Sequence, residues 1–216
     1  MHVAKPEVAY LYEFLKSGGP VMIPILLASV VGLAAFVERL WALRADRVIP
    51  RAVRIELMQL VKQARWDDAI NLCRKGDAPV CRVLEPVLLH RDQARGEIKE
   101  LAEEVGKREA AELERYSGIV GIVASVAPLL GLLGTVWGMI ITFDVIKEQG
   151  LGHVGQLAGG ISAALITTFA GLSVGIPALI AHRYLLSRID DLILELEETA
   201  LAVLDAVRGI SEEADA

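Results

Sequence analysis

Residues 116–143 read YSGIVGIVASVAPLLGLLGTVWGMIITF, and this stretch decides the fold class. It contains no Asp, Glu, Lys, Arg or His. As one helix rising 1.5 Å per residue it would be about 42 Å long, which exceeds the roughly 30 Å hydrocarbon core of a bilayer. We therefore predict a transmembrane helix that projects beyond the membrane.

Two further windows, residues 17–37 and 149–182, also lack Asp, Glu, Lys and Arg. The second would extend about 51 Å as a helix. The whole chain is 54% hydrophobic, above the roughly 45–50% of soluble domains. These windows predict an all-α integral membrane protein with three transmembrane helices, two of them long and extending into a cytoplasmic helical bundle.

The ends of these windows divide the chain into segments. Before the first window, Val8, Leu11, Tyr12 and Leu15 follow a helical apolar spacing that Gly18-Gly19-Pro20 interrupts. The predicted segments are an external or interfacial amphipathic helix (1–19), transmembrane helix 1 (20–43), a cytoplasmic helical domain (44–115), transmembrane helix 2 (116–147), a periplasmic turn (148–155), transmembrane helix 3 (156–184), and a cytoplasmic C-terminal helix and tail (185–216).

Apolar residues recur at helical spacing in the polar segments as well. An apolar face at residues 98–113 runs into the second span without a Gly-Pro break. After the third span, a stripe with spacing of mostly three or four residues needs partner helices to bury it; its members are Leu185, Ile189, Leu192, Leu196, Val203 and Val207.

The distribution of Lys and Arg predicts the orientation. Nearly all of them lie in residues 44–115 or after His182, whereas the N-terminal segment has only Lys5 and Lys16 and the connection between spans two and three only Lys147. Positive residues favour the cytoplasmic side. We therefore expect the N-terminus outside the cytoplasm, and the domain at 44–115 and the C-terminal tail inside it.

Patterns typical of soluble enzymes are missing from the sequence. No Ser-His-Asp, HExxH or P-loop arrangement occurs, and the G-x-G-x-x-G match at residues 150–155 lies between two spans rather than after a strand. Cys73 and Cys81 lack the additional His or Cys of a zinc site, so we interpret them as reduced structural thiols. The net charge of −6 disfavours nucleic acid. We expect a protein that is not an enzyme and holds no cofactor or metal.

Small and polar residues form a stripe on each of the last two spans. The stripes contain Gly131, Thr135, Gly138 and Thr142 in span two, and Gly160, Ala164, Thr168, Gly171, Gly175 and Ala178 in span three. Small residues let helices approach closely in lipid, so close packing explains the glycines. For Thr135 and Thr168, spacing alone leaves two readings open: hydroxyls bonded to their own backbone, or hydroxyls lining a wet interior surface.

No acid or base stands in the core of the three windows. Asp144, near the outer end of span two, is interpreted as an interfacial carboxylate. A proton pathway normally needs a titratable group. If this chain conducts protons, a partner must supply that group.

Several segments resemble one membrane family. They are APLLGLLGTVWGM at 127–139, GISAALITTFAGL at 160–172 with IPA at 176–178, GGPVM at 18–22, and ERL at 38–40. Together they resemble the ExbB/TolQ branch of the MotA/TolQ/ExbB proton channel family, over essentially the whole chain. MotA-like proteins have a further span, so three spans favour this branch.

The resemblance implies a stator-like subunit of an inner-membrane proton-driven motor. Five copies would surround a pore that holds a dimer of a single-span partner like ExbD or TolR. The membrane aspartate of that partner would carry the proton, and the complex would drive a TonB-like or TolA-like protein. Thr135 and Thr168 match the family's two pore threonines. Secondary pore candidates are Ser162, Thr167 and Thr142; the residues expected in helix packing or partner contact are Pro128, Gly131, Gly134, Gly138, Ala164, Gly171, Gly175 and Pro177.

One position departs from the family pattern. Typical ExbB and TolQ proteins carry a glutamate five residues before the second pore threonine, and here that residue is Ala163. The proton path of those members therefore cannot be transferred intact. An ExbB-like role in outer-membrane transport, a TolQ-like role in envelope integrity and a non-conducting membrane scaffold remain alternatives.

Overall fold

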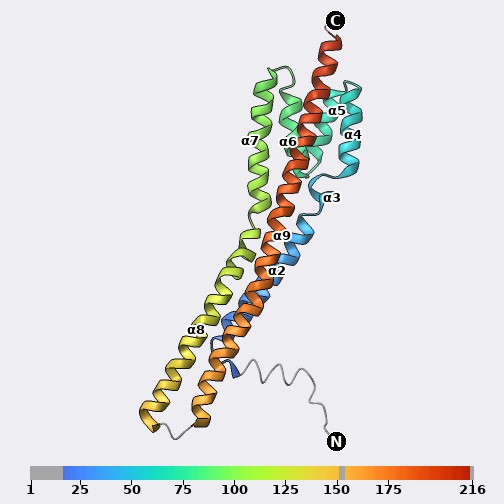
Figure 1. The fold of residues 1–216 in the computed structure, drawn as a ribbon. Helices are drawn as coiled ribbons and strands as arrows, with labels where there is room; N and C mark the ends of the chain where they lie inside the picture. The colour runs from blue at the N-terminus through green and yellow to red at the C-terminus, as the bar shows by residue number, and fades with distance from the viewer. Residues whose placement is uncertain (1–16, 151–153, 215–216) are drawn as a thin grey trace, which may run out of the picture. The chain divides into compact units, whose positions relative to one another are not determined.

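The computed structural model describes residues 17–150 and 154–214, and within these ranges it contains helices and no strand (Figure 1). In chain order the helices are α2 (Met22–Ala42), α3 (Ala45–Val48), α4 (Arg51–Lys62), α5 (Trp66–Lys75), α6 (Pro79–Leu89), α7 (Arg95–Glu114), α8 (Ser117–Gln149) and α9 (Val154–Ala214).

Three of these helices are long and apolar enough to cross a membrane. The qualifying stretches are Met22–Ala42, Ser117–Glu148 and Gly155–Val207. The predicted fold class, a helical protein with three membrane-length helices of which two are long, is confirmed. The amphipathic helix predicted at residues 1–19 lies almost entirely outside the described residues.

The chain forms two compact units. The first, here called the span unit, consists of Met1–Val37 and Gly118–Arg183; the second, the bundle unit, consists of Glu38–Ser117 and Tyr184–Ala216. The span unit therefore holds most of α2 and α8 and the first half of α9. The bundle unit holds α3 to α7 and the second half of α9.

The span unit turns its large apolar side chains outward. Ile122, Leu129, Leu165 and Ile180 are each more than 60% exposed. In water such surface would be unfavourable, but hydrocarbon solvates it. Gly19, just before α2, has a φ of 70°, a left-handed conformation that glycine adopts readily, so the chain is interrupted before the first span.

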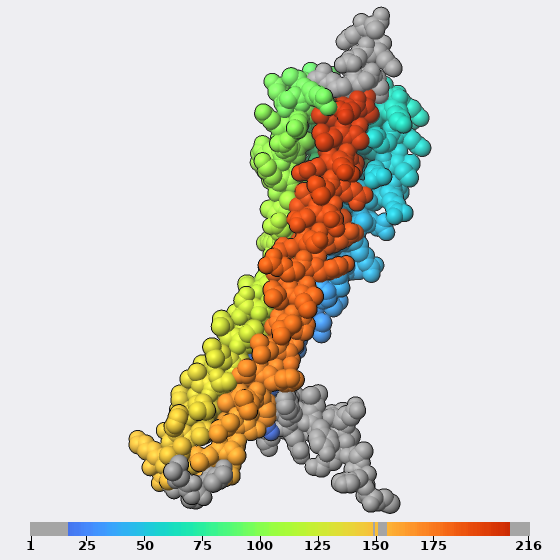
Figure 2. All heavy atoms as spheres, viewed as in Figure 1, coloured from blue at the N-terminus to red at the C-terminus, as the bar shows by residue number. Residues whose placement is uncertain are grey.

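The bundle unit has a conventional buried core. The predicted apolar stripe on α9 is buried: all six members, from Leu185 to Val207, are at most 3% exposed. The same unit contains buried residues of α4 to α7 such as Leu57, Ile70, Leu84 and Ile98. Figure 2 shows α9, in orange and red, between green α7 and cyan α4–α5 within this unit. Ion pairs from Arg54 and Arg95 of those helices to Glu195 and Asp205 of α9 agree with that placement.

No Gly-Pro sequence separates α7 from α8, but a two-residue turn, Arg115 and Tyr116, lies between them. Helix α7 ends at Glu114, and α8 begins at Ser117. The Ser117 hydroxyl donates a 2.6 Å hydrogen bond to the Glu114 carbonyl. A serine side chain that bonds a backbone carbonyl in this way competes with the helical ladder, which accounts for the interruption.

Candidate pore-lining site

Helices α8 and α9 run antiparallel and touch through their backbones. A Cβ atom on Gly171 would lie 2.6 Å from the Ala127 carbonyl oxygen and 2.9 Å from the Gly131 Cα. A Cβ on Gly138 would lie 2.7 Å from the Gly160 carbonyl oxygen. We call this contact the glycine seam; its members are Gly131, Gly134, Gly138, Gly160, Gly171 and Gly175. The seam allows a helix separation that larger residues would prevent.

Two of the secondary pore candidates pack against glycines of the seam. Thr167 is 1% exposed and its side chain fills the space beside Gly134, while Thr142 is 4% exposed and lies beside Gly160. Their hydroxyls donate to carbonyls of their own helices, Thr167 to Ala164 at 2.8 Å and Thr142 to Gly138 at 2.9 Å. Within the single chain, both side chains therefore contribute to packing between α8 and α9.

Other predicted packing residues also lie at this contact. Ala164 is buried, and its Cβ is 2.9 Å from where a Cβ on Gly138 would stand. Pro128 packs on Gly175, with its Cγ 2.5 Å from where a Cβ would be. Pro177 is exposed, as is Ser162, the remaining secondary pore candidate.

Thr135 and Thr168 are half-buried and lie at the margin of the seam. The Thr135 hydroxyl donates to the Leu132 carbonyl at 2.6 Å. The Thr168 hydroxyl is 3.3 Å from two carbonyls, that of Ala164 on its own helix and that of Gly131 on α8. Each hydroxyl donates one proton and has lone pairs that can still accept one.

The helical geometry places both threonines on one edge of the pair. Gly134 and Thr167 face each other across the seam, and the two threonines are the residues immediately after them. Successive residues of an α-helix are rotated by about 100° about the helix axis. Because α8 and α9 run in opposite directions and face each other, this rotation brings the residue after a contact position to the same edge of the pair on both helices. Thr135 and Thr168 thus share one edge at one level.

Helix α2 covers the other edge. Met22 and Ile25 of α2, with Val21 just before it, pack against four residues that each precede a seam contact: Leu130, Ile166, Ala170 and Val174. The residue before a contact position turns to the opposite side from the residue after it. The edge that carries the two threonines is therefore the one that α2 leaves uncovered.

The surroundings of the threonines are apolar and uncharged. Leu132, Leu165 and Leu172 follow seam contacts in the same way as the threonines, and all three are exposed. Ala163, at the family's glutamate position, is half-buried. Residues 117–143 and 154–181 contain no Asp, Glu, Lys, Arg or His. The two hydroxyls are consequently a polar pair in a surface that holds no titratable side chain.

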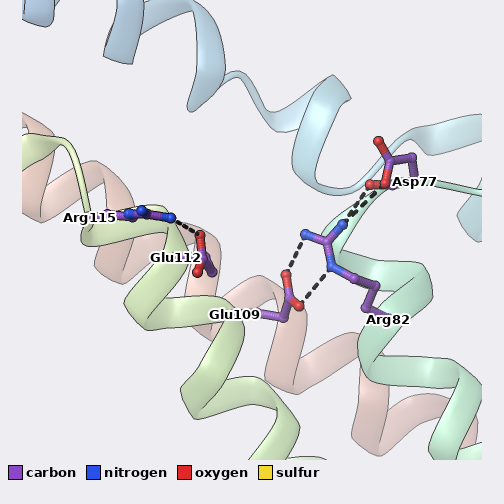
Figure 3. A network of polar contacts seen from close by, with 5 residues as sticks. All are labelled: Asp77, Arg82, Glu109, Glu112 and Arg115. Atoms are coloured by element: carbon purple, nitrogen blue, oxygen red, sulfur yellow. Dashed lines mark hydrogen bonds and ion pairs between the residues drawn. The ribbon is translucent and has the colours of Figure 1, made fainter.

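Charges concentrate instead in the bundle unit, where they form ion pairs (Figure 3). Arg82 of α6 binds Glu109 of α7 through two hydrogen bonds of 2.7 and 2.6 Å, and Glu109 is only 8% exposed. This bidentate contact raises the pKa of Arg82. Arg82 also donates to the Asp77 carbonyl at 2.9 Å. The network ties α6 to α7 and to the turn before α6; it has the form of a structural clamp.

The part of the chain that the structure describes contains no cluster of three or more His, Cys, Asp or Glu that could hold a metal ion. Sequence reasoning did not find the Arg82–Glu109 pair, because neither helical spacing nor a motif relates two residues on different helices. It placed Thr168 in the small-residue stripe and named Thr167 as a secondary pore candidate, whereas in the structure the side chain of Thr167 contacts the seam glycine Gly134 and Thr168 lies at the margin. Only the position of the partner helix shows that one enters the seam and the other lies beside it.

Three helices long and apolar enough to cross a membrane, two of which form a hairpin without charged side chains, are typical of a multi-pass membrane protein. The sequence profile of the MotA/TolQ/ExbB proton channel family matches residues 76–198. The chain belongs to the MotA/TolQ/ExbB proton channel family.

Individual relatives agree with this membership. The chain is 35% identical over 185 residues to the ExbB-like 1 biopolymer transport protein of Synechocystis sp., covering 82% of this chain and 70% of that one. It is 31% identical over 188 residues to the biopolymer transport protein ExbB of Neisseria meningitidis, with 79% and 84% covered. A biopolymer transport protein ExbB homologue from Methanothermobacter thermautotrophicus is 30% identical over 189 residues, with 86% and 66% covered. Together with the three apolar helices, these relatives support a multi-pass inner-membrane protein with a channel-type role.

Proposed function

We propose that this chain is the stator-like subunit of an ExbB-type proton-driven motor. In this proposal, five copies surround a central pore, a dimer of an ExbD-like single-span protein occupies the pore, and proton flow energises transport across the outer membrane through a TonB-like protein. The observation that carries the proposal is the position of Thr135 and Thr168. They place two hydroxyls on the edge of the α8–α9 hairpin that α2 leaves uncovered.

A pore assembled from this edge would present hydroxyls to a partner carboxylate. A bare carboxylate in a membrane interior is costly unless it is protonated or hydrogen-bonded. On leaving its backbone carbonyl, each hydroxyl can donate to the ionised form, and its lone pairs can accept from the protonated form. The hydrogen bond to the ionised carboxylate is the stronger one, so protonation would weaken the contact and let the partner move to the next subunit.

The sequence supports a model in which the partner, and not this chain, supplies the group that carries the proton. Since the apolar parts of α8 and α9 lack a titratable side chain and Ala163 replaces the family glutamate, the proton-carrying group must come from elsewhere. The seam is already filled by contacts inside the subunit. Contacts with other copies, with the partner and with membrane lipids must therefore use the exposed apolar faces of α2, α8 and α9.

The test is co-purification with an ExbD-like partner, followed by subunit counting by native mass spectrometry in mild detergent. The expected result is five copies of this chain with two of the partner, and proton uptake by vesicles only when both are present. A monomer that binds no such partner would overturn the proposal. An assembled complex that conducts no protons would identify a structural scaffold, and rescue of envelope integrity rather than of outer-membrane uptake would identify the TolQ-like alternative.

Orientation is tested separately. We propose that the N-terminus is periplasmic and the bundle unit cytoplasmic, because Lys and Arg concentrate in the latter. In a chain with Cys73→Ser and Cys81→Ser, a single cysteine replacing Gly152 should react with an impermeant maleimide added outside spheroplasts. One replacing Gln93, which is exposed, should react only after lysis. Equal labelling of both sites from outside would overturn the three-span topology.

A further inference from the structure

The bundle unit contains a pair of cysteines that the proposed function does not use. Cys73 lies near the end of α5 and Cys81 in the first turn of α6, and both are at most 3% exposed. No disulfide joins them. Both belong to a polar part of the chain outside the membrane-length helices.

The turn between α5 and α6 directs the two thiols toward each other. Cys81 Sγ is 2.5 Å from where a Cβ on Gly76 would be, so its side chain packs against the end of α5. The Gly76 N–H donates to the Cys73 carbonyl at 3.2 Å, so the Cys81 sulfur packs on the turn that directly follows Cys73. An ion pair of 2.9 Å between Arg74 of α5 and Glu85 of α6 holds the same two helices together.

The surroundings make the two thiols chemically unequal. The hydrogen bond with Cys73 lowers the pKa of Cys81 to about 7, with further help from the Ala78 backbone and the Arg82 guanidinium. The same hydrogen bond and burial raise the pKa of Cys73. Cys81 also lies in the first turn of an 11-residue helix, where the helix dipole favours a thiolate. The start of α6 and the Arg82 guanidinium thus favour the thiolate of Cys81, which is the form that attacks an oxidant.

We propose that Cys73 and Cys81 form a thiol modification site for peroxides, in which Cys81 is the attacking sulfur and Cys73 the resolving one, and that oxidation joins α5 to α6 by a disulfide. Since both sulfurs are buried, a small neutral oxidant such as hydrogen peroxide fits the site better than a bulky disulfide. This site is independent of the pore, because the reacting atoms all lie within the bundle unit.

The chemistry balances in two steps. The Cys81 thiolate attacks one oxygen of hydrogen peroxide; an S–O bond forms, the O–O bond breaks, and hydroxide leaves and takes up a proton to become water. The Cys73 sulfur then attacks the Cys81 sulfenic acid, an S–S bond forms, and the hydroxyl leaves with the Cys73 proton as a second water. Two thiols are oxidised, one peroxide is reduced, and a dithiol reductant reverses the change.

The experiment uses the full chain, reduced and purified in mild detergent. After brief exposure to hydrogen peroxide and quenching with catalase, the protein is unfolded, alkylated with N-ethylmaleimide and weighed by mass spectrometry. The expected product carries no maleimide, is two hydrogens lighter than the reduced chain, and takes up two maleimides after treatment with dithiothreitol. Full double alkylation after peroxide, or dimers linked through one cysteine, would overturn the proposal.

Single variants test the assigned roles. Cys73→Ser keeps a hydrogen-bonding group beside Cys81 and should accumulate a sulfenic acid that dimedone traps. Cys81→Ser should give about tenfold less adduct, because its remaining thiol is mostly protonated. Equal adduct yields in the two variants would refute the assignment of Cys81 as the attacking sulfur, and the wild-type disulfide measurement does not depend on either variant folding.

Discussion

Replacing Gly171 with alanine tests whether the glycine seam sets the distance between α8 and α9. The new Cβ would lie 2.6 Å from a carbonyl oxygen and 2.9 Å from a Cα atom, both belonging to the backbone of α8. Ordinary contacts at these positions begin near 3.4 Å. Backbone atoms cannot rotate away as a side chain can, so the helices must separate by several tenths of an ångström.

The expected cost follows from overpacking. Forcing an extra carbon into a filled contact costs about 1–3 kcal/mol. Alanine is a better helix former than glycine by about 0.5–1 kcal/mol, which offsets part of that loss. Gly159 provides a matched control on the same helix, because nothing lies within 4 Å of the Cβ it would gain. We therefore expect Gly171→Ala to be less stable than Gly159→Ala by about 1–3 kcal/mol.

Thermal unfolding in detergent, followed by size-exclusion chromatography of the heated samples, measures the difference. A gap of about 3–10 °C between the variants is expected for a chain of this size. Gly118→Ala, which also meets nothing within 4 Å, repeats the control on α8. If Gly171→Ala unfolded at the same temperature as both controls, α8 and α9 would not be in backbone contact at this point, and the assignment of the seam would be wrong.

Three further predictions concern the threonines, the clamp and the thiols. The double variant Thr135→Val, Thr168→Val should assemble normally but lower proton-driven activity by about ten- to a hundredfold per hydroxyl, the range expected for losing a hydrogen bond to a charged group. Thr199→Val, which removes a buried hydroxyl of the bundle unit, is the control. Unchanged activity in the double variant, or a similar loss in the control, would refute a role of the two hydroxyls in proton transfer. Glu109→Gln should destabilise the bundle unit by about 1–2 kcal/mol. This loss is smaller than the one expected for breaking a fully buried ion pair, because the Arg82 side chain is 44% exposed. Denaturant unfolding measures the loss, and an unchanged midpoint would contradict the prediction. The rate of peroxide oxidation should fall about tenfold from pH 8 to pH 6 and should level off above pH 8. The reason is that the deprotonated form of Cys81 reacts and that its pKa is about 7. A rate that keeps rising steeply above pH 8 would indicate a thiol with an ordinary pKa.

The membrane-length helices and the buried face of α9 could be predicted from the sequence, because each follows from a pattern that repeats along one segment. Three uncharged windows predict three membrane-length helices, because no soluble core needs such lengths without a charge. The apolar stripe from Leu185 to Val207 predicts a buried helix face, because residues three and four apart share a face. Both signals are periodic, and neither depends on knowing which element lies opposite.

Features that depend on the identity of the opposing element could not be predicted. Thr167 and Thr168 have the same side chain on neighbouring positions, yet one is buried beside Gly134 and the other lies at the seam margin. Their difference is a rotation of about 100°, which has meaning only when the direction of α8 is known. The proximity of Cys73 and Cys81 likewise depends on the turn that joins α5 to α6, and the cysteines' sequence spacing carries no such information.

The uncovered edge of the α8–α9 hairpin explains why the absence of a charge and the presence of two hydroxyls belong together. A carboxylate fixed on this edge would need its own compensating partner in lipid and would hold an incoming carboxylate away by repulsion. Hydroxyls carry no net charge, so they remain compatible with lipid during assembly and can bond a carboxylate in either protonation state. In the proposed motor, the titratable group belongs to the moving partner and the neutral bonding groups to the fixed subunit, so each protonation event would weaken one contact without leaving a buried charge behind. The unmodified complex should therefore already transport protons, and adding a carboxylate here by Ala163→Glu should change only the pH dependence of that transport. If the unmodified complex carried no protons while Ala163→Glu made it conduct, the hydroxyl pair alone would be insufficient, and the proposed division of labour would be wrong.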